Sequence, residues 1–254
     1  MPKIRPLPKK PLVEAIFELR WNIPSEEGDP NYSLFIGRLF DRLEKEYPYY
    51  ESLPTSLIPA QAAGQIAQHR FRTAENGWPL VQVGPGLVTV NDTDSYIWKD
   101  FGDRIRLVID KVYEAYPDKE AFAIDKLLLR YIDSFELNEE DDLLGFLNTN
   151  LKIGISYPTQ LFDDVPIENK PTQIKVRSAY LVESPKGTID ISMSSGRHRK
   201  EKVILMDTQF FSGKDELPEM PDGFNHWVEE AHKLTDDWFF KLIEGDFERR
   251  FEDA

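Results

Sequence analysis

The hydrophobic pattern of this chain runs twice through one order of elements: a strand, a helix, three strands and a second helix. Each copy opens with a segment in which apolar and polar side chains alternate, Leu12–Trp21 in the first and Leu127–Leu137 in the second. Alternation with a period of two is typical of a strand with one buried face. Two βαβββα halves joined by short hairpins predict the α+β class. We expect a largely antiparallel sheet with helices on one face and the opposite face open.

The predicted halves are residues 1–118 and 119–254, and we expect them to form one compact unit. The other predicted strands are Ile66–Thr73, Pro79–Val83, Leu87–Asn91, Gln173–Glu183, Thr188–Ser194 and Val203–Phe211. The predicted helices are Tyr32–Leu43, Trp98–Val112, Glu139–Leu151 and Asp222–Arg250, with a loop between Pro48 and Pro54. Residue identity between the halves is faint, so a duplication and a coincidental order within one α+β domain both remain open.

The composition limits the class of protein. Cysteine is absent, which excludes disulfides, thiolate metal sites and a cysteine nucleophile. No apolar run approaches the roughly 20 residues that span a bilayer, and residues 1–10 lack the apolar core of a signal peptide. We therefore expect a soluble, unprocessed, cytoplasmic protein that does not act at a membrane.

Negative charge is concentrated in two segments. Residues 135–170 hold 8 acidic and 2 basic side chains, and residues 212–254 hold 13 acidic and 5 basic ones, which accounts for the whole net charge of −14. The negative charge of the protein repels the phosphates of nucleic acid, so a nucleic-acid partner is not expected. We expect a protein partner, and a basic one would complement these segments. Assembly with a second copy of the chain remains open.

An acidic side chain interrupts the apolar face of the strand that opens the second half. Asp133 shares that face with Tyr131 and with leucine and phenylalanine side chains. A buried carboxyl either finds hydrogen-bond donors or its pKa rises, because an unpaired buried charge is costly. Asp133 could therefore be a general base or ligand anchor beside Tyr131, or it could pair with an arginine or backbone amides in a structural network.

Charged side chains mark the opposite, open face of the predicted sheet. Glu14, Glu18 and Arg20 of the first strand share this face with Arg130 of its counterpart. The predicted register of the later hairpin adds Lys175, Arg177, Asp190 and Ser192. Mixed charges of this kind form either a solvated surface or a platform that recognises a protein partner.

Two further clusters of functional residue types are weaker candidates. His226 and His232 are six residues apart on a predicted helix, so they point in different directions and do not match a zinc motif. The basic segment Gly196–Lys202 could contact phosphate, but a solvated hairpin loop explains it as well. We therefore expect no metal, no other cofactor and no catalytic residue.

Three blocks of the sequence resemble a known family. They are Pro11–Trp21, Leu80–Asn91 with Phe71 and Arg72 before it and Trp98 after it, and Leu129–Phe135. The blocks are similar to the sporadically distributed family of uncharacterised bacterial proteins of about this length. The similarity covers nearly the whole chain, and Leu80–Asn91 is its most specific part. The resemblance implies no activity, cofactor or catalytic residue, and the patchy distribution of the family implies genes on mobile or defence islands.

The sequence therefore favours a noncatalytic interaction or adaptor protein, acting in a bacterial defence or toxin-neutralising system. Two alternatives belong to other classes. One is a small-molecule-binding protein with an apolar cavity beneath the aromatic C-terminal helix, whose stripe includes Trp238 and Phe239. The other is a metal-dependent hydrolase or nuclease centred on Asp133.

Overall fold

The computed structural model describes residues 7–23, 28–58, 64–93, 95–138 and 140–252. The strands are β1 (Leu12–Trp21), β2 (Tyr49–Ser52), β3 (His69–Arg72), β4 (Leu80–Gly84), β5 (Leu87–Asp92), β6 (Ile124–Glu136), β7 (Lys175–Glu183), β8 (Lys186–His198) and β9 (Glu201–Gly213). The α-helices are α1 (Tyr32–Leu43), α3 (Trp98–Ala115), α4 (Leu143–Leu151), α5 (Phe224–Ile243) and α6 (Asp246–Glu252). Short 3-10 helices are η1 (Pro54–Leu57), η2 (Thr159–Leu161) and η3 (Lys214–Glu216).

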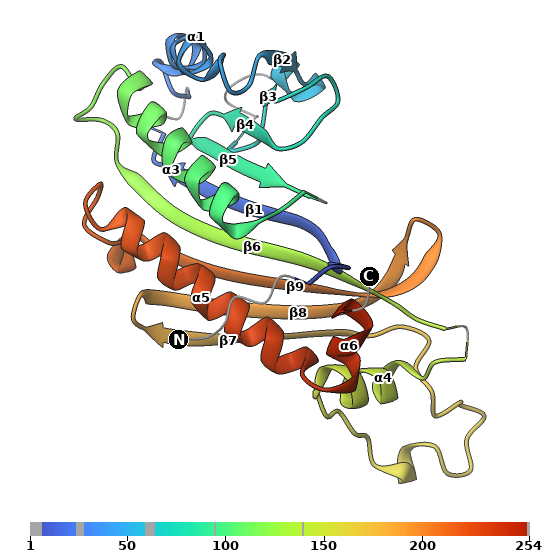
Figure 1. The fold of residues 1–254 in the computed structure, drawn as a ribbon. Coiled ribbons are helices and arrows are strands. Elements are labelled where there is room, and N and C mark those ends of the chain that lie inside the picture. Colours follow the sequence, from blue (N-terminus) through green and yellow to red (C-terminus); the bar gives the residue numbers. More distant parts are fainter. Residues whose placement is uncertain (1–6, 24–27, 59–63, 94, 139, 253–254) are drawn as a thin grey trace.

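Within the described residues, all nine strands join one antiparallel sheet in the order β2-β3-β4-β5-β1-β6-β9-β8-β7. The strand order is symmetric about the central pair β1 and β6. Outward from β1 come β5, β4 and β3, and outward from β6 come the corresponding strands of the second half, β9, β8 and β7. The two βαβββα halves therefore lie side by side on one sheet, and the fold is α+β (Figure 1). The boundary predicted after residue 118 falls in the connection between α3 and β6.

The edge strand β2 departs from the predicted order. We expected a loop between Pro48 and Pro54, whereas Tyr49–Ser52 pairs with β3. All four residues of β2 are exposed, so no apolar alternation marks this strand in the sequence. Its conformation follows from hydrogen bonding to a neighbouring strand that is distant along the chain.

The helices pack on one face of the sheet. On β1, Ala15, Phe17, Leu19 and Trp21 are fully buried, while the polar residues between them face the other side. α3 and α5 lie along this buried face (Figure 1). The two helices also meet each other, because Trp98 and Arg106 of α3 both donate hydrogen bonds to the carboxylate of Glu229 on α5. Burial of the aromatic and aliphatic side chains beneath them supplies most of the driving force for this layer packing.

Two helix boundaries differ from the predicted ones. The single C-terminal helix predicted over Asp222–Arg250 is two helices, α5 and α6, which Gly245 separates with a backbone φ of +104°. A residue with a side chain rarely adopts that conformation, so a glycine there ends the helix.

The second difference concerns the start of α4. This helix was predicted to begin at Glu139, which lies outside the described residues, and it begins at Leu143. The side chain of Asp142 accepts a hydrogen bond from the amide of Gly145 and so caps the N-terminus of the helix.

Among the described residues, no helix is long and apolar enough to cross a membrane.

Candidate functional site

A cavity of about 160 Å³ lies between α5, the central strand β6 and the segment that leads into α3. Its walls are mostly apolar and aromatic, and they come from parts of the chain that are far apart in the sequence. The lining residues include Lys10, Leu12, Tyr96, Trp98, Tyr131, Asp133, Thr208, His232, Thr235, Asp236, Phe239 and Phe240. The cavity therefore lies where the two halves of the fold meet.

A β-bulge shapes the edge of this cavity. The pairing of β1 with β6 shifts by one residue between Leu12 and Glu14, so that Leu12 lies opposite Asp133. A bulge turns side chains to the other face of a strand, and here it directs Leu12 toward the cavity while Glu14 stays on the open face. The carbonyl of Pro11 accepts a hydrogen bond from the amide of Ser134, at 2.8 Å, which fixes the chain just before the bulge.

A chain of hydrogen bonds joins three side chains of the cavity wall. The Tyr96 hydroxyl donates to the Tyr131 hydroxyl at 3.1 Å, and the Tyr131 oxygen lies 3.1 Å from Nδ1 of His232. The donor in the contact between Tyr131 and His232 depends on the tautomer of the imidazole. Burial lowers the pKa of His232 to about 3, so the ring is neutral near pH 7. The indole of Trp98 stacks on the imidazole, with ring centroids 3.7 Å apart.

Asp133 lies in this cavity without a polar partner. It is only 4% exposed, and its side chain makes no hydrogen bond or ion pair within the part of the chain that the structure describes. Burial raises its pKa to about 7, and the charge of Asp207 adds to the increase. The arginine or backbone partner considered for Asp133 from the sequence is thus absent among the described residues, and an unpartnered buried carboxyl requires another explanation.

A second carboxyl and a hydroxyl in the cavity are also unpartnered. Burial raises the pKa of Asp236 on α5 to about 6, with a smaller contribution from Asp237, and no hydrogen bond holds the Asp236 side chain among the described residues. Thr208 of β9 is 2% exposed, and its Oγ1 is buried without a hydrogen-bond partner among the described residues. Thr208 pairs with Tyr131 across β6 and β9, and Asp133 pairs with Met206 two positions away on the same face. Thr208 and Asp133 therefore lie on the sheet side of the cavity, whereas Asp236 lies on the helix side.

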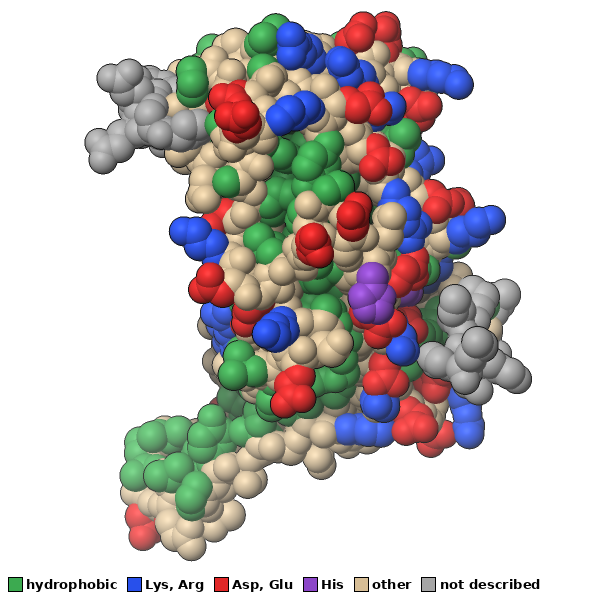
Figure 2. All heavy atoms as spheres, turned by 90° about the vertical axis from the view of Figure 1, so that its left-hand side faces the viewer, with side chains coloured by type: hydrophobic (Ala, Val, Ile, Leu, Met, Phe, Trp, Pro, Cys, Tyr) green, Lys and Arg blue, Asp and Glu red, His purple; other side chains and the backbone are tan. Residues whose placement is uncertain are grey.

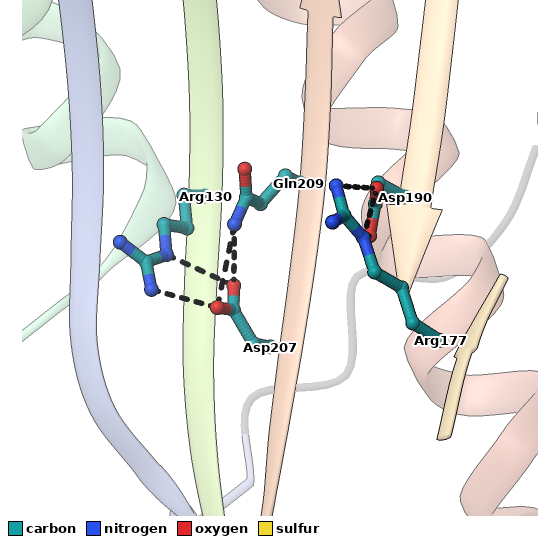
Figure 3. Close-up of polar contacts among 5 residues, drawn as sticks. All are labelled: Arg130, Arg177, Asp190, Asp207 and Gln209. Carbon is teal, nitrogen blue, oxygen red and sulfur yellow. Dashed lines mark hydrogen bonds and ion pairs between the residues drawn. The ribbon is translucent and has the colours of Figure 1, made fainter. Parts of the chain in front are cut away.

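The other predicted site residues lie on the opposite, open face. Arg130 donates two hydrogen bonds to Asp207, at 2.9 and 2.6 Å, and Gln209 donates to the same carboxylate (Figure 3). Arg177 binds Asp190 in a similar way, with Nε 2.8 Å from Oδ2 (Figure 3). Arg177 pairs with Ser192, and Asp190 pairs with Ala179, so Arg177, Asp190 and Ser192 share one face of the hairpin.

The open face of the first half contains a similar network. Arg20 donates to both carboxylate oxygens of Glu18, and Asn91 donates to Glu14 at 2.8 Å. Lys175 lies on the exposed edge strand β7. The predicted binding residues thus divide between two surfaces: Tyr131 and Asp133 face the cavity, whereas Glu14, Glu18, Arg20, Arg130, Lys175 and Arg177 lie on the open face.

Sequence reasoning missed Tyr96, Trp98, Thr208 and Asp236 as members of a site. Each has an ordinary place in a helix, strand or turn, and only its neighbours in space make it unusual. His232 was considered as a metal ligand with His226, but His226 is exposed whereas His232 is packed against Trp98. In the described residues, no group of three or more histidine, cysteine, aspartate or glutamate side chains is placed to hold a metal ion.

Comparison with known proteins gives no family for this chain. No family model matches it, and no curated protein matches it. Among solved structures, TBP of Methanococcus jannaschii is similar with a TM-score of 0.23 and 12% identity, over 88% of this chain and 99% of that one. The di-domain ARO/CYC protein StfQ from the steffimycin biosynthetic pathway is similar with a TM-score of 0.26 and 11% identity, over 92% of this chain and 98% of that one. Likeness at this level carries no argument about function.

Proposed function

We propose that this protein binds a small organic molecule in the cavity between α5 and β6. The observation that carries the proposal is Asp133, a carboxyl that is 96% buried, faces the cavity and has no polar partner in the described residues. Ligand sites in proteins are typically apolar cavities with a few polar groups that fix the orientation of the ligand. A ligand that pairs with Asp133 would account for a group whose burial is otherwise unfavourable.

The walls of the cavity are held in place before any ligand arrives. The hydrogen bonds from Tyr96 through Tyr131 to His232, together with the stacking of Trp98, fix the aromatic side chains on one side. A site with fixed walls loses little conformational entropy on binding. A volume of about 160 Å³ is close to the roughly 150 Å³ of an engineered cavity that binds benzene. A ligand of one ring with a short substituent therefore fits the cavity.

The first test is direct binding of single-ring compounds, observed by NMR of the compound and by the thermal shift of the protein. We expect at least one compound to bind. Thr208→Leu adds side-chain volume inside the cavity, so we expect this variant to bind the compound more weakly. Thr188→Leu on the open face of β8 is the matched control and should leave binding unchanged. The proposal fails if no single-ring compound binds, or if both variants weaken binding equally.

We also propose a protein interaction surface, because a specific observation favours one. The segment between α4 and β7 extends away from the sheet at the bottom of Figure 1, and Figure 2 shows apolar side chains gathered on this projection. Tyr157 and Ile167 are each 60% exposed there, and Leu161 and Val165 are also exposed. Exposed apolar patches of this kind often mark contacts with other proteins. Asp163, Asp164 and Glu168 lie among them, which favours a basic partner.

This second proposal is tested by affinity purification from the native host. A triple variant, Tyr157→Ser, Leu161→Ser and Ile167→Ser, should lose a stoichiometric partner that the original protein recovers. Leu57→Ser is the control, because Leu57 is 86% exposed on a different part of the molecule. If the triple variant and the control recover the partner equally, the partner does not bind at this apolar patch. An adaptor role in bacterial defence or toxin neutralisation, in the cytoplasm, is the setting that we propose for such a partner.

A further inference from the structure

We infer that the molecule bound in the cavity is a compact organic cation, an ammonium group on a single aromatic ring, with the ammonium held by Asp133 and Thr208. This inference rests on the proposed small-molecule function and adds the chemical class of the ligand. It follows from three features of the cavity: unpartnered polar groups on the sheet, aromatic side chains around them, and the state of the neighbouring basic side chains.

The unpartnered polar groups require hydrogen-bond donors. Two carboxyls, Asp133 and Asp236, and the hydroxyl of Thr208 line one cavity and make no side-chain hydrogen bond among the described residues. Carboxylates only accept hydrogen bonds, and a primary ammonium offers three donors and no acceptor. Asp133 and Thr208 lie at neighbouring positions on the same face of β6 and β9, so one ammonium group can donate to both, whereas a neutral ring leaves the buried Asp133 without a partner.

No basic side chain among the described residues pairs with Asp133 or Asp236. His232 is neutral near pH 7, since burial of its ring against Trp98 lowers its pKa to about 3. Lys10 lies at the cavity wall, but its ammonium donates to the backbone carbonyl of Tyr96 and its charge acts on Asp92. An anionic ligand would thus meet two carboxyls, with Lys10 as the one basic side chain besides the neutral His232 in the described lining, so the cavity favours a cation over an anion.

The aromatic side chains suit both parts of such a ligand. Tyr96, Trp98, Phe239 and Phe240 line the cavity together with Tyr131. The faces of aromatic rings attract a cation, and their edges and faces can pack against the ring of the ligand. The cavity volume of about 160 Å³ accommodates about one ring.

Binding of a cation should release a proton. Burial raises the pKa of Asp133 to about 7 in the empty cavity, and a nearby ammonium lowers it because it favours the ionised form. The charged or titratable groups around Asp133 are Lys10, Asp236 and His232 on the cavity side, Tyr96 and Tyr131 beside it, and Asp207 behind it. Of these, the pKa of Asp236 is raised to about 6, so it is largely ionised near neutral pH and favours the cation further.

The experiment uses four probes with the same ring: benzylamine, benzyl alcohol, toluene and benzoate. Their affinities are measured by isothermal titration calorimetry with the full chain at about pH 6 and about pH 8. We expect benzylamine to bind at least roughly tenfold more tightly than benzyl alcohol at the higher pH, and the preference to shrink at the lower pH as Asp133 becomes protonated. Titrations in buffers with different enthalpies of ionisation should show proton release with benzylamine alone.

Asp133→Asn should abolish the preference for benzylamine and leave toluene binding intact, which also shows that the variant is folded. Asp236→Asn should reduce the preference by a smaller factor. The inference is overturned if benzyl alcohol, toluene or benzoate binds as tightly as benzylamine, or if the preference survives in Asp133→Asn. If none of the four probes binds, the proposed function itself fails, so the two failures are distinguishable.

Discussion

The hydroxyl oxygen of Tyr131 on β6 lies 3.1 Å from Nδ1 of His232 on α5. The contact joins the central strand of the sheet to the helix that covers it, and it lies in the wall of the cavity. With Tyr96 donating to the same hydroxyl, a single oxygen connects three elements of the fold. The stability of the protein and the geometry of the site therefore depend on the same hydrogen bonds.

Replacing Tyr131 by phenylalanine should destabilise the protein by about 1–3 kcal/mol. The change removes two hydrogen bonds and leaves Nδ1 of His232 and the hydroxyl of Tyr96 without this partner. Urea denaturation gives the change in the free energy of unfolding. Tyr180→Phe is the control, since Tyr180 is 54% exposed on β7, and it should change stability by less than about 0.5 kcal/mol. Equal effects of the two changes would contradict the role given to the Tyr131 hydroxyl.

The stability of the empty protein should respond to pH through Asp133. Its pKa is raised from 3.8 to about 7 by burial, so between these values the folded protein holds a proton that the unfolded chain has released. Stability therefore falls as the pH rises through this window, by up to about 1.4 kcal/mol per pH unit.

Asp133→Asn cannot release this proton, so its stability relative to the original protein should increase from about pH 4 to about pH 7 and then level off. Asp236 contributes a slope of the same sign, and His232, whose pKa is lowered to about 3, contributes the opposite one. Both residues are present in the two proteins, so the difference isolates Asp133. Denaturation midpoints across this range measure it, and a constant difference would show that the pKa of Asp133 is not raised.

Two threonines of the cavity wall should behave differently when valine replaces them. Oγ1 of Thr208 has no hydrogen-bond partner in the described part of the chain, whereas Oγ1 of Thr235 donates to the carbonyls of Ala231 and His232 at 2.9 Å. Thr208→Val should leave the stability of the empty protein unchanged or raise it, because the buried hydroxyl is unpaired. Thr235→Val should lower it by about 0.5–1.5 kcal/mol. Thermal unfolding of both variants tests this order, and the reverse order would refute it.

The charge of Asp207 should act through the sheet on Asp133. Asp207 lies on the open face, yet its charge contributes to the raised pKa of Asp133. Asp207→Asn should therefore lower the pKa of Asp133, which NMR titration of the aspartate carboxyl carbons can follow. Asp190→Asn serves as the control, because Asp190 lies on the same face and is paired with an arginine as Asp207 is, but it is no cause of the Asp133 shift. An unchanged pKa in Asp207→Asn would show that the two faces are electrically independent.

Gly84 at the end of β4 should not tolerate alanine. A Cβ atom at this position would lie 1.9 Å from the backbone oxygen of Ile66, and backbone atoms cannot move aside as a flexible side chain can. Gly84→Ala should cost about 1–3 kcal/mol or prevent folding. Gly196→Ala on β8 has open space around the new Cβ atom and should have little effect. Denaturation of the two variants gives the comparison, and similar stabilities would contradict the close approach at Gly84.

The sequence alone determined the α+β class, the order of most elements and the faces of the central strands. Side-chain alternation places Phe17 and Leu129 on the buried face and Glu18 and Arg130 on the other, because the period of a strand is two and only one face is covered by helices. It also singled out Asp133 as a carboxyl on an apolar face, since that position follows directly from the pattern.

Only the tertiary structure decided what surrounds Asp133. The pairing of β1 with β6, the bulge after Leu12 and the path of α5 bring Tyr96, Thr208 and Asp236 to one cavity, and none of these is set by local sequence preferences. The exposed strand β2 and the break at Gly245 were missed for related reasons. β2 is defined by hydrogen bonds to a distant strand, and a single glycine inside a helical pattern does not by itself show that its φ will be positive. Local periodicity fixes which face a side chain occupies, whereas long-range packing fixes what it meets there.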